Sequence, residues 1–251
     1  MRLFDLDGQV AAVTGARRGI GQAIALALAE AGADIVGIGP NAMTETAKLV
    51  ESAGRRFYDL RADLSEVTLA SVVMRRTIEV AGRVDILVNN AGIIKRADVL
   101  DVTDNDWAEV MAVNLRAPFF LSQAAARHMI GASKPGRIIN VASLLSFQGG
   151  IRVPAYTASK HGIAGITRAL ANELGIHGIT VNAIAPGYFV TDNTAALRAD
   201  KARADSILAR IPVGRWGQPA DIAGVAVFLA SAASAYVNGA IIPVDGGWLG
   251  R

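Results

Sequence analysis

The sequence predicts an α/β fold in which helices cover both faces of a mostly parallel sheet. Short apolar runs rich in branched residues recur along the chain, and longer segments with helical periodicity separate them. Strands that are buried on both faces are typically continuous apolar runs, and their alternation with helices indicates βαβ units. The 251 residues contain no linker, internal repeat or low-complexity tract. We therefore expect a single doubly wound domain over residues 1–251.

The expected elements follow one another in a regular order. Six runs are predicted as strands: Val10–Thr14, Ile35–Ile38, Val84–Asn89, Arg137–Val141, Thr180–Ile184 and Ala240–Val244. Helical periodicity and good helix formers mark Ile20–Ala31, Met43–Ala53, Asp104–Met129, Tyr156–Leu174 and Ala220–Leu229. Residues 187–217 are different, because they are polar and follow the carboxyl end of a strand. A substrate lid belongs at this place in such folds, so we expect one at about 187–217.

Composition and charge exclude several classes of function. Hydrophobic residues make up 52% of the chain and charged residues 19%, which is typical of a folded globular protein. The formal net charge is only +3 and the basic pairs are scattered, so we expect no nucleic-acid partner. No apolar window is long enough to span a membrane. The first residues carry Asp5 where a signal peptide would be apolar, and we expect a cytoplasmic location.

The residue types that are missing limit the chemistry. The sequence has no cysteine, which removes disulfides, thiolate catalysis and thiolate metal sites. Its three histidines are dispersed, so we expect no metal site. Catalysis must therefore use Ser, Tyr, Lys, Asn, a carboxylate or a bound cofactor.

A glycine-rich turn follows the first expected strand and leads into an Ala-rich helix. Its sequence, residues 14–21, is TGARRGIG. Such a turn offers free backbone N–H groups and the positive end of the helix dipole, and glycine lets the backbone approach a pyrophosphate. The GxxxGxG spacing differs from the general GxGxxG dinucleotide fingerprint. The turn predicts a dinucleotide site at Gly15, Gly19, Ile20 and Gly21, and an ordinary βα turn with glycines for packing is the alternative.

The residues that would select the cofactor leave the choice open. The second expected strand ends in Gly39-Pro40-Asn41. These residues provide neither a carboxylate to bind the ribose hydroxyls of NAD nor a positive charge to bind the 2′-phosphate of NADP. Arg17 or Arg18 could reach a 2′-phosphate, stack on adenine or point to solvent. Asp63 could accept a hydrogen bond from the adenine amino group, or it could cap the next helix.

A tyrosine and a lysine stand four residues apart at the start of one expected helix. This spacing places Tyr156 and Lys160 on one helix face, one turn apart. The pKa of a phenol is ordinarily about 10, and a neighbouring ammonium lowers it by favouring the phenolate. Tyr156 could then take a proton from an alcohol or return one to an alkoxide. The same pair occurs by chance in many helices, so other groups must support this interpretation.

Three further features support it. Ser143 follows the strand Arg137–Val141 at the edge of the sheet where ligands bind, and its hydroxyl could polarise a carbonyl. The run Asn89-Asn90-Ala91-Gly92 ends another strand at the same edge and could line a cofactor. Asn114 interrupts an apolar helical stretch, and a buried amide needs partners. A satisfied core amide is the alternative role of Asn114.

Together these motifs resemble the classical short-chain dehydrogenase/reductase family along essentially the whole chain. The shared features are the loop Thr14–Gly21, Asn89–Gly92, Asn114, Ser143, the pair Tyr156 and Lys160, and Pro186-Gly187 followed by Thr191. The resemblance implies a Rossmann-like domain with a seven-stranded parallel sheet, NAD or NADP as cofactor, and a homotetramer. It implies a catalytic tetrad of Asn114, Ser143, Tyr156 and Lys160, in which Lys160 also holds the nicotinamide ribose and Asn114 fixes a proton-relay water. The implied cofactor contacts are Gly15, Arg17, Arg18, Gly19, Ile20, Gly21, Asp63, Leu64, Asn90, Ala91, Gly92, Tyr156, Lys160, Pro186, Gly187 and Thr191.

Within the family, three segments are similar to those of members that act on sugar acids. They are residues 146–154, 185–194 and 244–248. This similarity implies a sugar-acid substrate and favours NAD, despite the two arginines of the glycine loop. Ser143, Gln148 and Arg152 are then expected to contact the substrate, with Arg152 binding its carboxylate bidentately. Arg96 and Arg215 are the other candidates for the carboxylate, and a surface or interface salt bridge is the alternative for all three arginines.

Two other functions remain open at this point. An NADPH-dependent 3-oxoacyl-acyl-carrier-protein reductase would suit the same glycine loop, and it predicts NADPH use and a basic surface for an acidic carrier protein. A regulatory protein that binds a dinucleotide without catalysis would have the same fold. The presence of Ser143, Tyr156 and Lys160 favours an enzyme.

Overall fold

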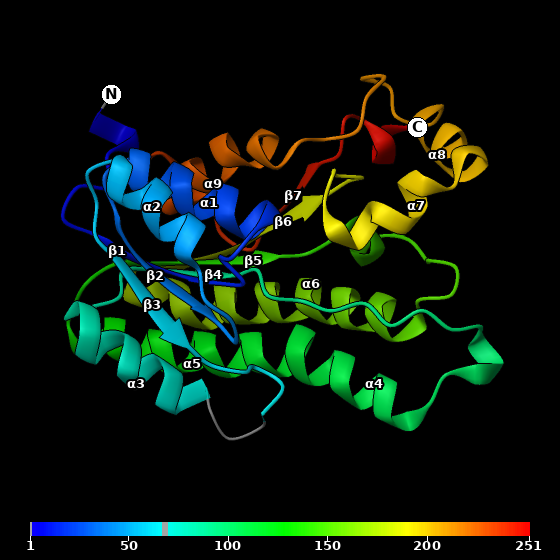
Figure 1. Cartoon of the computed structure of the whole chain (residues 1–251). Helices are drawn as coiled ribbons and strands as arrows, with labels where there is room; N and C mark the ends of the chain where they lie inside the picture. The colour runs from blue at the N-terminus through cyan, green and yellow to red at the C-terminus, as the bar shows by residue number, and fades with distance from the viewer. Residues whose placement is uncertain (1, 67–69) are drawn as a thin grey trace.

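The computed structural model describes residues 2–66 and 70–251, and a seven-stranded parallel sheet forms its centre (Figure 1). The strands are β1 (Val10–Thr14), β2 (Asp34–Gly39), β3 (Phe57–Arg61), β4 (Ile86–Asn89), β5 (Gly136–Val141), β6 (Ile179–Pro186) and β7 (Ile241–Val244). Their order is β3-β2-β1-β4-β5-β6-β7 and every pairing is parallel. This arrangement confirms the predicted fold class. The chain changes direction across the sheet between β1 and β4, which is where doubly wound sheets bind ligands.

Helices cover both faces of the sheet (Figure 1). One face carries α1 (Gly19–Glu30), α2 (Thr44–Ser52) and α9 (Ala223–Ala230). The other carries α3 (Ala70–Ala81), α4 (Asp104–Met111), α5 (Ala117–Gly131) and α6 (Pro154–Leu174). The expected continuous helix over 104–129 is interrupted, because residues Ala112–Arg116 form a π-helical turn between α4 and α5. Such turns are rare and often occur at functional sites.

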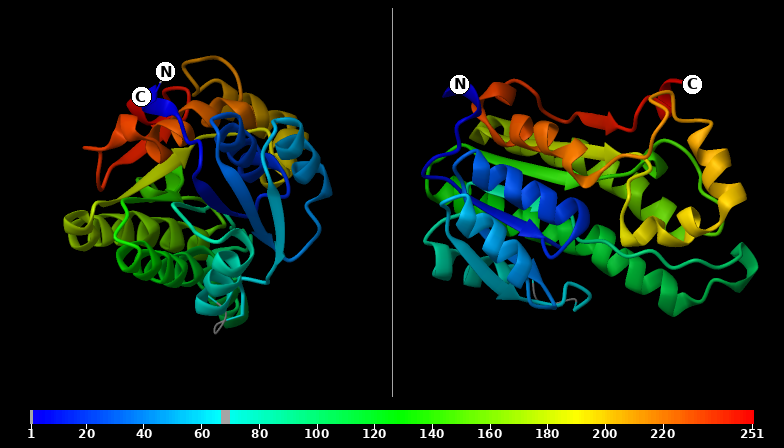
Figure 2. Two further views of the ribbon diagram at one scale, coloured as in Figure 1. Left: turned by 90° about the vertical axis from the view of Figure 1, so that its left-hand side faces the viewer. Right: turned by 45° about the horizontal axis from the view of Figure 1, so that its top comes forward.

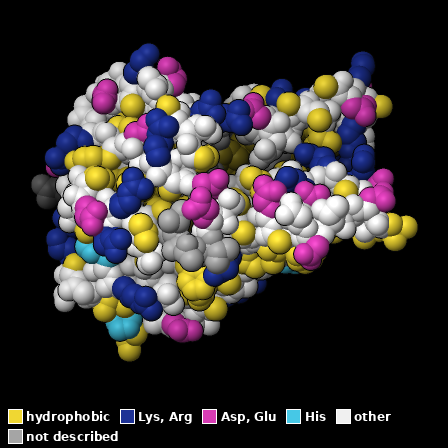
Figure 3. All heavy atoms as spheres, turned by 60° about the horizontal axis from the view of Figure 1, so that its bottom comes forward, with side chains coloured by type: hydrophobic (Ala, Val, Ile, Leu, Met, Phe, Trp, Pro, Cys, Tyr) yellow, Lys and Arg dark blue, Asp and Glu magenta, His cyan; other side chains and the backbone are white. Residues whose placement is uncertain are grey.

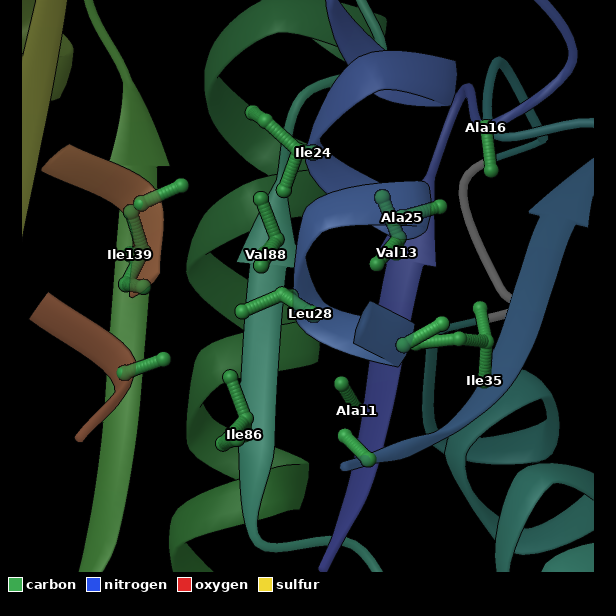
Figure 4. Packing of buried hydrophobic residues seen from close by; sticks show 14 of the residues in the cluster. Ala11, Val13, Ala16, Ile24, Ala25, Leu28, Ile35, Ile86, Val88 and Ile139 are labelled. Carbon is green, nitrogen blue, oxygen red and sulfur yellow. The ribbon is translucent and has the colours of Figure 1, made fainter. Parts of the chain in front are cut away.

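Apolar side chains on both faces of the strands hold the layers together. Ile24 and Leu28 of α1 are fully buried in a cluster with Ile86, Val88 and other side chains of the central strands (Figure 4). A second cluster packs α3, α5 and α6 against the opposite face. Burying one such side chain contributes about 1.5–3 kcal/mol. The central strands are therefore anchored on both sides, which fixes the positions of the loops at their carboxyl ends.

The segment after β6 forms a small separate lobe beyond the carboxyl ends of the strands (Figures 1 and 2). It contains α7 (Ala195–Ala199) and α8 (Lys201–Leu208). Ile207 and Ile211 of this lobe are buried against Leu144 and Trp248, so the lobe packs on the body of the protein.

Among residues 2–66 and 70–251, no helix is long and apolar enough to cross a membrane. The same residues contain no group of three His, Asp or Glu side chains that could hold a metal ion.

Candidate active site

A cleft of about 1050 Å³ opens at the carboxyl ends of the strands. In Figure 3 it is the recess between the larger body of the molecule and the smaller lobe, with Lys and Arg side chains on both sides of its opening. Every expected cofactor contact lines this cleft, from Gly15 at one end to Thr191 in the lobe. Ser143, Tyr156, Lys160 and Gln148 line it as well. The sequence motifs therefore meet in one place, although they come from six different parts of the chain.

The glycine loop has a backbone shape that only glycine adopts readily. Gly15 and Gly19 have φ angles of +67° and +58°, in the left-handed region. Gly21 is needed for a different reason, because a Cβ there would collide with the Gly15 carbonyl oxygen and the Asn90 side-chain amide. The loop can thus pass close to a ligand while the start of α1 points at the cleft. These features fit a bound pyrophosphate, which the N-terminus of a helix favours.

Hydrogen bonds fix this loop to the end of β4. The Thr14 hydroxyl accepts hydrogen bonds from the backbone N–H groups of Asn90 and Ala91, both at 2.9 Å. The Asn90 side-chain amide donates to the Thr14 carbonyl oxygen at 2.9 Å. The ends of β1 and β4 are therefore held together at the point where the chain changes direction across the sheet. These contacts give Thr14 and Asn90 a positioning role beneath the predicted dinucleotide site.

The two loop arginines have different surroundings. Arg18 forms an ion pair with Asp192 of the lobe, and both side chains are largely exposed. An exposed pair of this kind contributes at most about 1 kcal/mol. Arg17 lines the cleft, as do Gly39, Pro40 and Asn41, and no ion pair engages it within the described residues. Arg17 is therefore the loop arginine that is available to a 2′-phosphate.

Asp63 stabilises a turn after β3 and does not cap the next helix, which is described from Ala70 onward. Its Oδ1 accepts hydrogen bonds from the Ser65 backbone N–H at 2.9 Å and from the Ser65 hydroxyl at 2.8 Å. The same side chain lines the cleft beside Leu64. The aspartate thus shapes the turn after β3, and its other oxygen has no hydrogen-bond partner among the described residues.

Tyr156 and Lys160 lie on one face of α6, as their spacing predicts. The Lys160 Nζ lies 5.5 Å from the centroid of the Tyr156 ring and donates a hydrogen bond to the Val141 carbonyl oxygen at 2.6 Å. Lys160 is only 4% exposed, and its burial lowers the pKa of the ammonium to about 8. The hydrogen bond to Val141 at the end of β5 therefore holds this lysine in place beneath the tyrosine.

Opposing effects act on the Tyr156 phenol. Burial raises its pKa, while a hydrogen bond with Ser143 and the positive charge of Arg96 lower it. Burial is the largest of these effects, so the phenol is neutral at neutral pH in this state. Ser143 and Tyr156 both line the cleft, within reach of each other. A substrate oxygen placed there could contact both groups.

Asn114 lies behind the cleft and does not line it. The residue is 1% exposed in the π-helical turn. Its Nδ2 donates to the Ile93 carbonyl oxygen at 2.9 Å and to the Ser159 hydroxyl at 3.2 Å, and its Oδ1 accepts from the Ile93 N–H at 2.8 Å. The Ser159 hydroxyl in turn donates to the Tyr156 carbonyl oxygen at 2.7 Å. The Asn114 side chain is thus a satisfied amide that ties the loop after β4 to the start of α6.

The structure corrects the expected carboxylate contact. Arg152 has a left-handed backbone (φ +64°), forms an ion pair with Asp98 at 3.1 Å and does not line the cleft. Arg215 is equally remote, because Asp221 binds it bidentately at 2.6 and 2.9 Å. Arg96 is the one of these three that lines the cleft, and it donates to the Asn193 carbonyl oxygen at 3.0 Å.

Several cleft residues were given no role from the sequence, among them Tyr188, Arg203, Arg210 and Trp248. The Tyr188 ring centroid lies 4.7 Å from that of Trp248, and the Arg210 guanidinium lies 4.0 Å from the Trp248 ring centroid. The Trp248 Nε1 donates to the Gln148 Oε1 at 3.4 Å. Tyr188 and Trp248 lie in two of the segments that resemble sugar-acid enzymes, but their contacts with each other and with Arg210 depend on long-range packing.

Comparisons with known proteins agree with this geometry. Residues 15–249 match a family model described as enoyl-(acyl carrier protein) reductase. The chain is 56% identical over 248 residues to the 2-dehydro-3-deoxy-D-gluconate 5-dehydrogenase of Escherichia coli (strain K12), covering 99% of this chain and 98% of that one.

Solved structures extend the similarity to the fold. One from Agrobacterium tumefaciens, described as a candidate 2-deoxy-D-gluconate 3-dehydrogenase with bound NADP, has a TM-score of 0.94 and 54% identity over 100% of both chains. A gluconate 5-dehydrogenase from Burkholderia cenocepacia in complex with NADP and tartrate has a TM-score of 0.94 and 39% identity, covering 100% of this chain and 98% of that one. The motifs, the sheet order and these full-length similarities together show that the chain belongs to the short-chain dehydrogenase/reductase family.

Proposed function

We propose that this protein is an NAD(P)-dependent oxidoreductase that acts on a hydroxyl or keto carbon of a sugar acid. The substrate is of the 2-deoxy-D-gluconate or 2-dehydro-3-deoxy-D-gluconate type. The observation that carries this proposal is the meeting of Ser143, Tyr156 and Lys160 in the same cleft as the glycine loop. The names of the relatives at 54–56% identity supply the substrate class.

The residues of the cleft suit an alcohol oxidation and its reverse. The bound nicotinamide supplies the site with a hydride acceptor or donor at its C4 carbon. In the oxidising direction, Tyr156 takes the proton from the substrate hydroxyl group, and the carbon that bears this hydroxyl loses a hydride. The Ser143 hydroxyl donates a hydrogen bond to the substrate oxygen. The positive charge of Arg96 favours the phenolate that must exist before the proton is taken, and the Lys160 ammonium lies 5.5 Å from the centroid of the same ring.

Lys160 and Asn114 are proposed to have the other roles of the tetrad. From its position on α6, Lys160 would also hold the nicotinamide ribose. Asn114 would help fix a proton-relay water through the backbone it organises, since its side chain is already satisfied by Ile93 and Ser159. The other expected cofactor contacts, from Gly15 to Thr191, would hold the dinucleotide. Among them, Asp63 would accept a hydrogen bond from the adenine amino group.

We propose that NADP binds at least as well as NAD. The preference for NAD rested on family resemblance, and the related structures with a bound cofactor contain NADP. The end of β2 carries no carboxylate that a 2′-phosphate would repel, since it reads Gly39-Pro40-Asn41. Arg17 on the facing loop is free to pair with that phosphate.

The homotetramer, the cytoplasmic location, the single domain and a substrate lid at about 187–217 are likewise proposals. Large apolar side chains on the outer helices support association, such as Trp107 of α4 and Phe120 of α5, which are 41% and 38% exposed. Light scattering of the purified protein would measure the assembly. The lobe that contains α7 and α8 lines the cleft, as a lid would.

The proposed function can be tested on a panel of substrates, with turnover measured by the absorbance of the reduced nicotinamide. It contains 2-deoxy-D-gluconate, 2-dehydro-3-deoxy-D-gluconate, D-gluconate and a 3-oxoacyl thioester, each with NAD(H) and NADP(H). We expect turnover of a sugar acid. Turnover of the thioester alone, with NADPH, would instead establish the 3-oxoacyl reductase, and binding of the dinucleotide without any turnover would indicate the regulatory protein.

A further inference from the structure

The end of the cleft nearest the lobe is lined by arginines that have no acidic partner. Arg203 and Arg210 both line the cleft, and within residues 2–66 and 70–251 neither forms an ion pair. Of the carboxylates that line the cleft, Glu109 pairs with Lys95 and Asp192 with Arg18, while Asp63 accepts hydrogen bonds from Ser65 in the turn after β3. A charged side chain that faces a cleft without a counterion is a candidate for binding a charged ligand. This part of the cleft therefore favours an anion.

Packing holds the Arg210 guanidinium in one place. Its central carbon lies 4.0 Å from the centroid of the Trp248 ring, and Trp248 itself is only 4% exposed. Tyr188 packs on the same indole, and Gln148 accepts a hydrogen bond from its Nε1. A guanidinium that stacks on an aromatic ring keeps the N–H groups at its edge free for a carboxylate. Arg210 is thus preorganised in a way that most surface arginines are not.

Arg203 adds its charge to the same region. The positive charges of Arg203 and Arg210 both oppose the rise in the Tyr188 pKa that burial causes, so both act near one phenol. Tyr188 also lines the cleft, together with Ser143 and Tyr156. The anion site and the proposed reaction site therefore share one cavity.

We propose that Arg210, assisted by Arg203, binds the carboxylate of the substrate and so makes the enzyme specific for acids. This inference rests on the proposed function. It replaces Arg152, which faces Asp98 outside the cleft.

Two measurements on the full-length protein test the role of Arg210. The first is initial rates with the best sugar acid and NADP, and the second is calorimetric titration of the NADP-loaded protein with tartrate, a hydroxy acid that a related structure contains. The variants are Arg210→Gln and Arg210→Lys. The matched control is Lys201→Gln, which removes the same charge from α8 at a residue that pairs with Asp205 and does not line the cleft.

Arg210→Gln should raise the KM for the sugar acid about 10- to 100-fold and weaken tartrate binding by a similar factor, because a charge-assisted hydrogen bond is lost. The kcat and the KM for NADP should change little, since this contact is made equally in the ground and transition states. Arg210→Lys should fall between the wild type and Arg210→Gln, and Lys201→Gln should match the wild type.

The proposal and the function on which it rests can fail separately. Wild-type turnover of a sugar acid together with unchanged KM and tartrate affinity in Arg210→Gln would overturn the role of Arg210 and leave the function standing. An equal loss in Lys201→Gln would also overturn it, because the effect would then be one of net charge. If the wild type turns over no sugar acid, the proposed function fails, and the tartrate titration still decides whether Arg210 binds carboxylates.

Discussion

Replacing Lys160 by methionine should abolish most activity without destabilising the fold. Burial lowers the pKa of this ammonium from 10.5 to about 8, which corresponds to roughly 3 kcal/mol against the charged form at neutral pH. Methionine removes this cost, but it also removes the 2.6 Å hydrogen bond to the Val141 carbonyl oxygen. Losing that bond and leaving the acceptor unpaired costs about 1–3 kcal/mol. The two effects nearly cancel, so the free energy of unfolding of Lys160→Met should lie within about 2 kcal/mol of that of the wild type at pH 7.

The pH dependence of this comparison has a definite sign. The pKa of Lys160 is lower in the folded state than in the unfolded state, so between about pH 8 and 10.5 the unfolded chain binds more protons. The wild type therefore gains stability from this group as the pH rises through that window, and the variant does not. Urea unfolding of both proteins at pH 7 and pH 9.5 measures the difference. A variant that is more than 3 kcal/mol less stable than the wild type at pH 7 would refute the reasoning. So would a wild type that gains no stability relative to the variant between pH 7 and pH 9.5.

Three other substitutions test separate parts of the site. Ser143→Ala removes a hydroxyl that faces the Tyr156 phenol, and kcat should fall about 10²- to 10³-fold with cofactor affinity retained; an unchanged kcat would exclude Ser143 from the oxyanion contact. Gly21→Ala places a methyl group against the Gly15 carbonyl oxygen and should cost about 1–3 kcal/mol of stability and weaken NADP binding, as thermal unfolding with and without NADP would measure. Arg17→Ala should raise the KM for NADP about 10- to 100-fold and leave that for NAD nearly unchanged, with Arg18→Ala as the comparison; equal effects on both cofactors would remove Arg17 from the 2′-phosphate.

Five of the six strands that sequence patterns identified are almost wholly buried, and the sixth, β7, is a partly exposed edge strand that still carries an apolar run. Every residue of β1 and β6 is buried, so each reads as a continuous apolar run. The edge strand β3 is half-buried and carries Asp59 and Arg61, and it was absent from the six predicted runs. An edge strand needs no apolar run, and its sequence resembles that of a loop.

The helix expected over 104–129 shows a second limit of periodicity. Residues 112–116 widen into a π-helical turn that separates α4 from α5, yet the apolar pattern continues across it. What stabilises the turn is tertiary: Asn114 is bound by Ile93 and Ser159, from segments 21 and 45 residues away. Such contacts cannot be seen from local sequence.

The site itself was predicted unequally well. Residues fixed by strand ends and helix starts, such as Gly15, Ser143 and Tyr156, were found because motif and topology place them together. The carboxylate contact was not, because Arg152 is near Ser143 and Tyr156 in sequence but its left-handed backbone accompanies an ion pair with Asp98 outside the cleft. Arg210 reaches the cleft only because the lobe packs on Trp248, which is 38 residues later.

The central claim is that Tyr156 transfers the proton in a cleft shared with the dinucleotide. Turnover of the sugar acid by Tyr156→Phe, measured beside NADPH binding by fluorescence, tests it most directly. The phenyl ring keeps the packing and loses only the hydroxyl, so we predict a fall in kcat of about 10²- to 10⁴-fold with NADPH affinity within a few-fold of the wild type. Undiminished turnover in Tyr156→Phe would contradict the account.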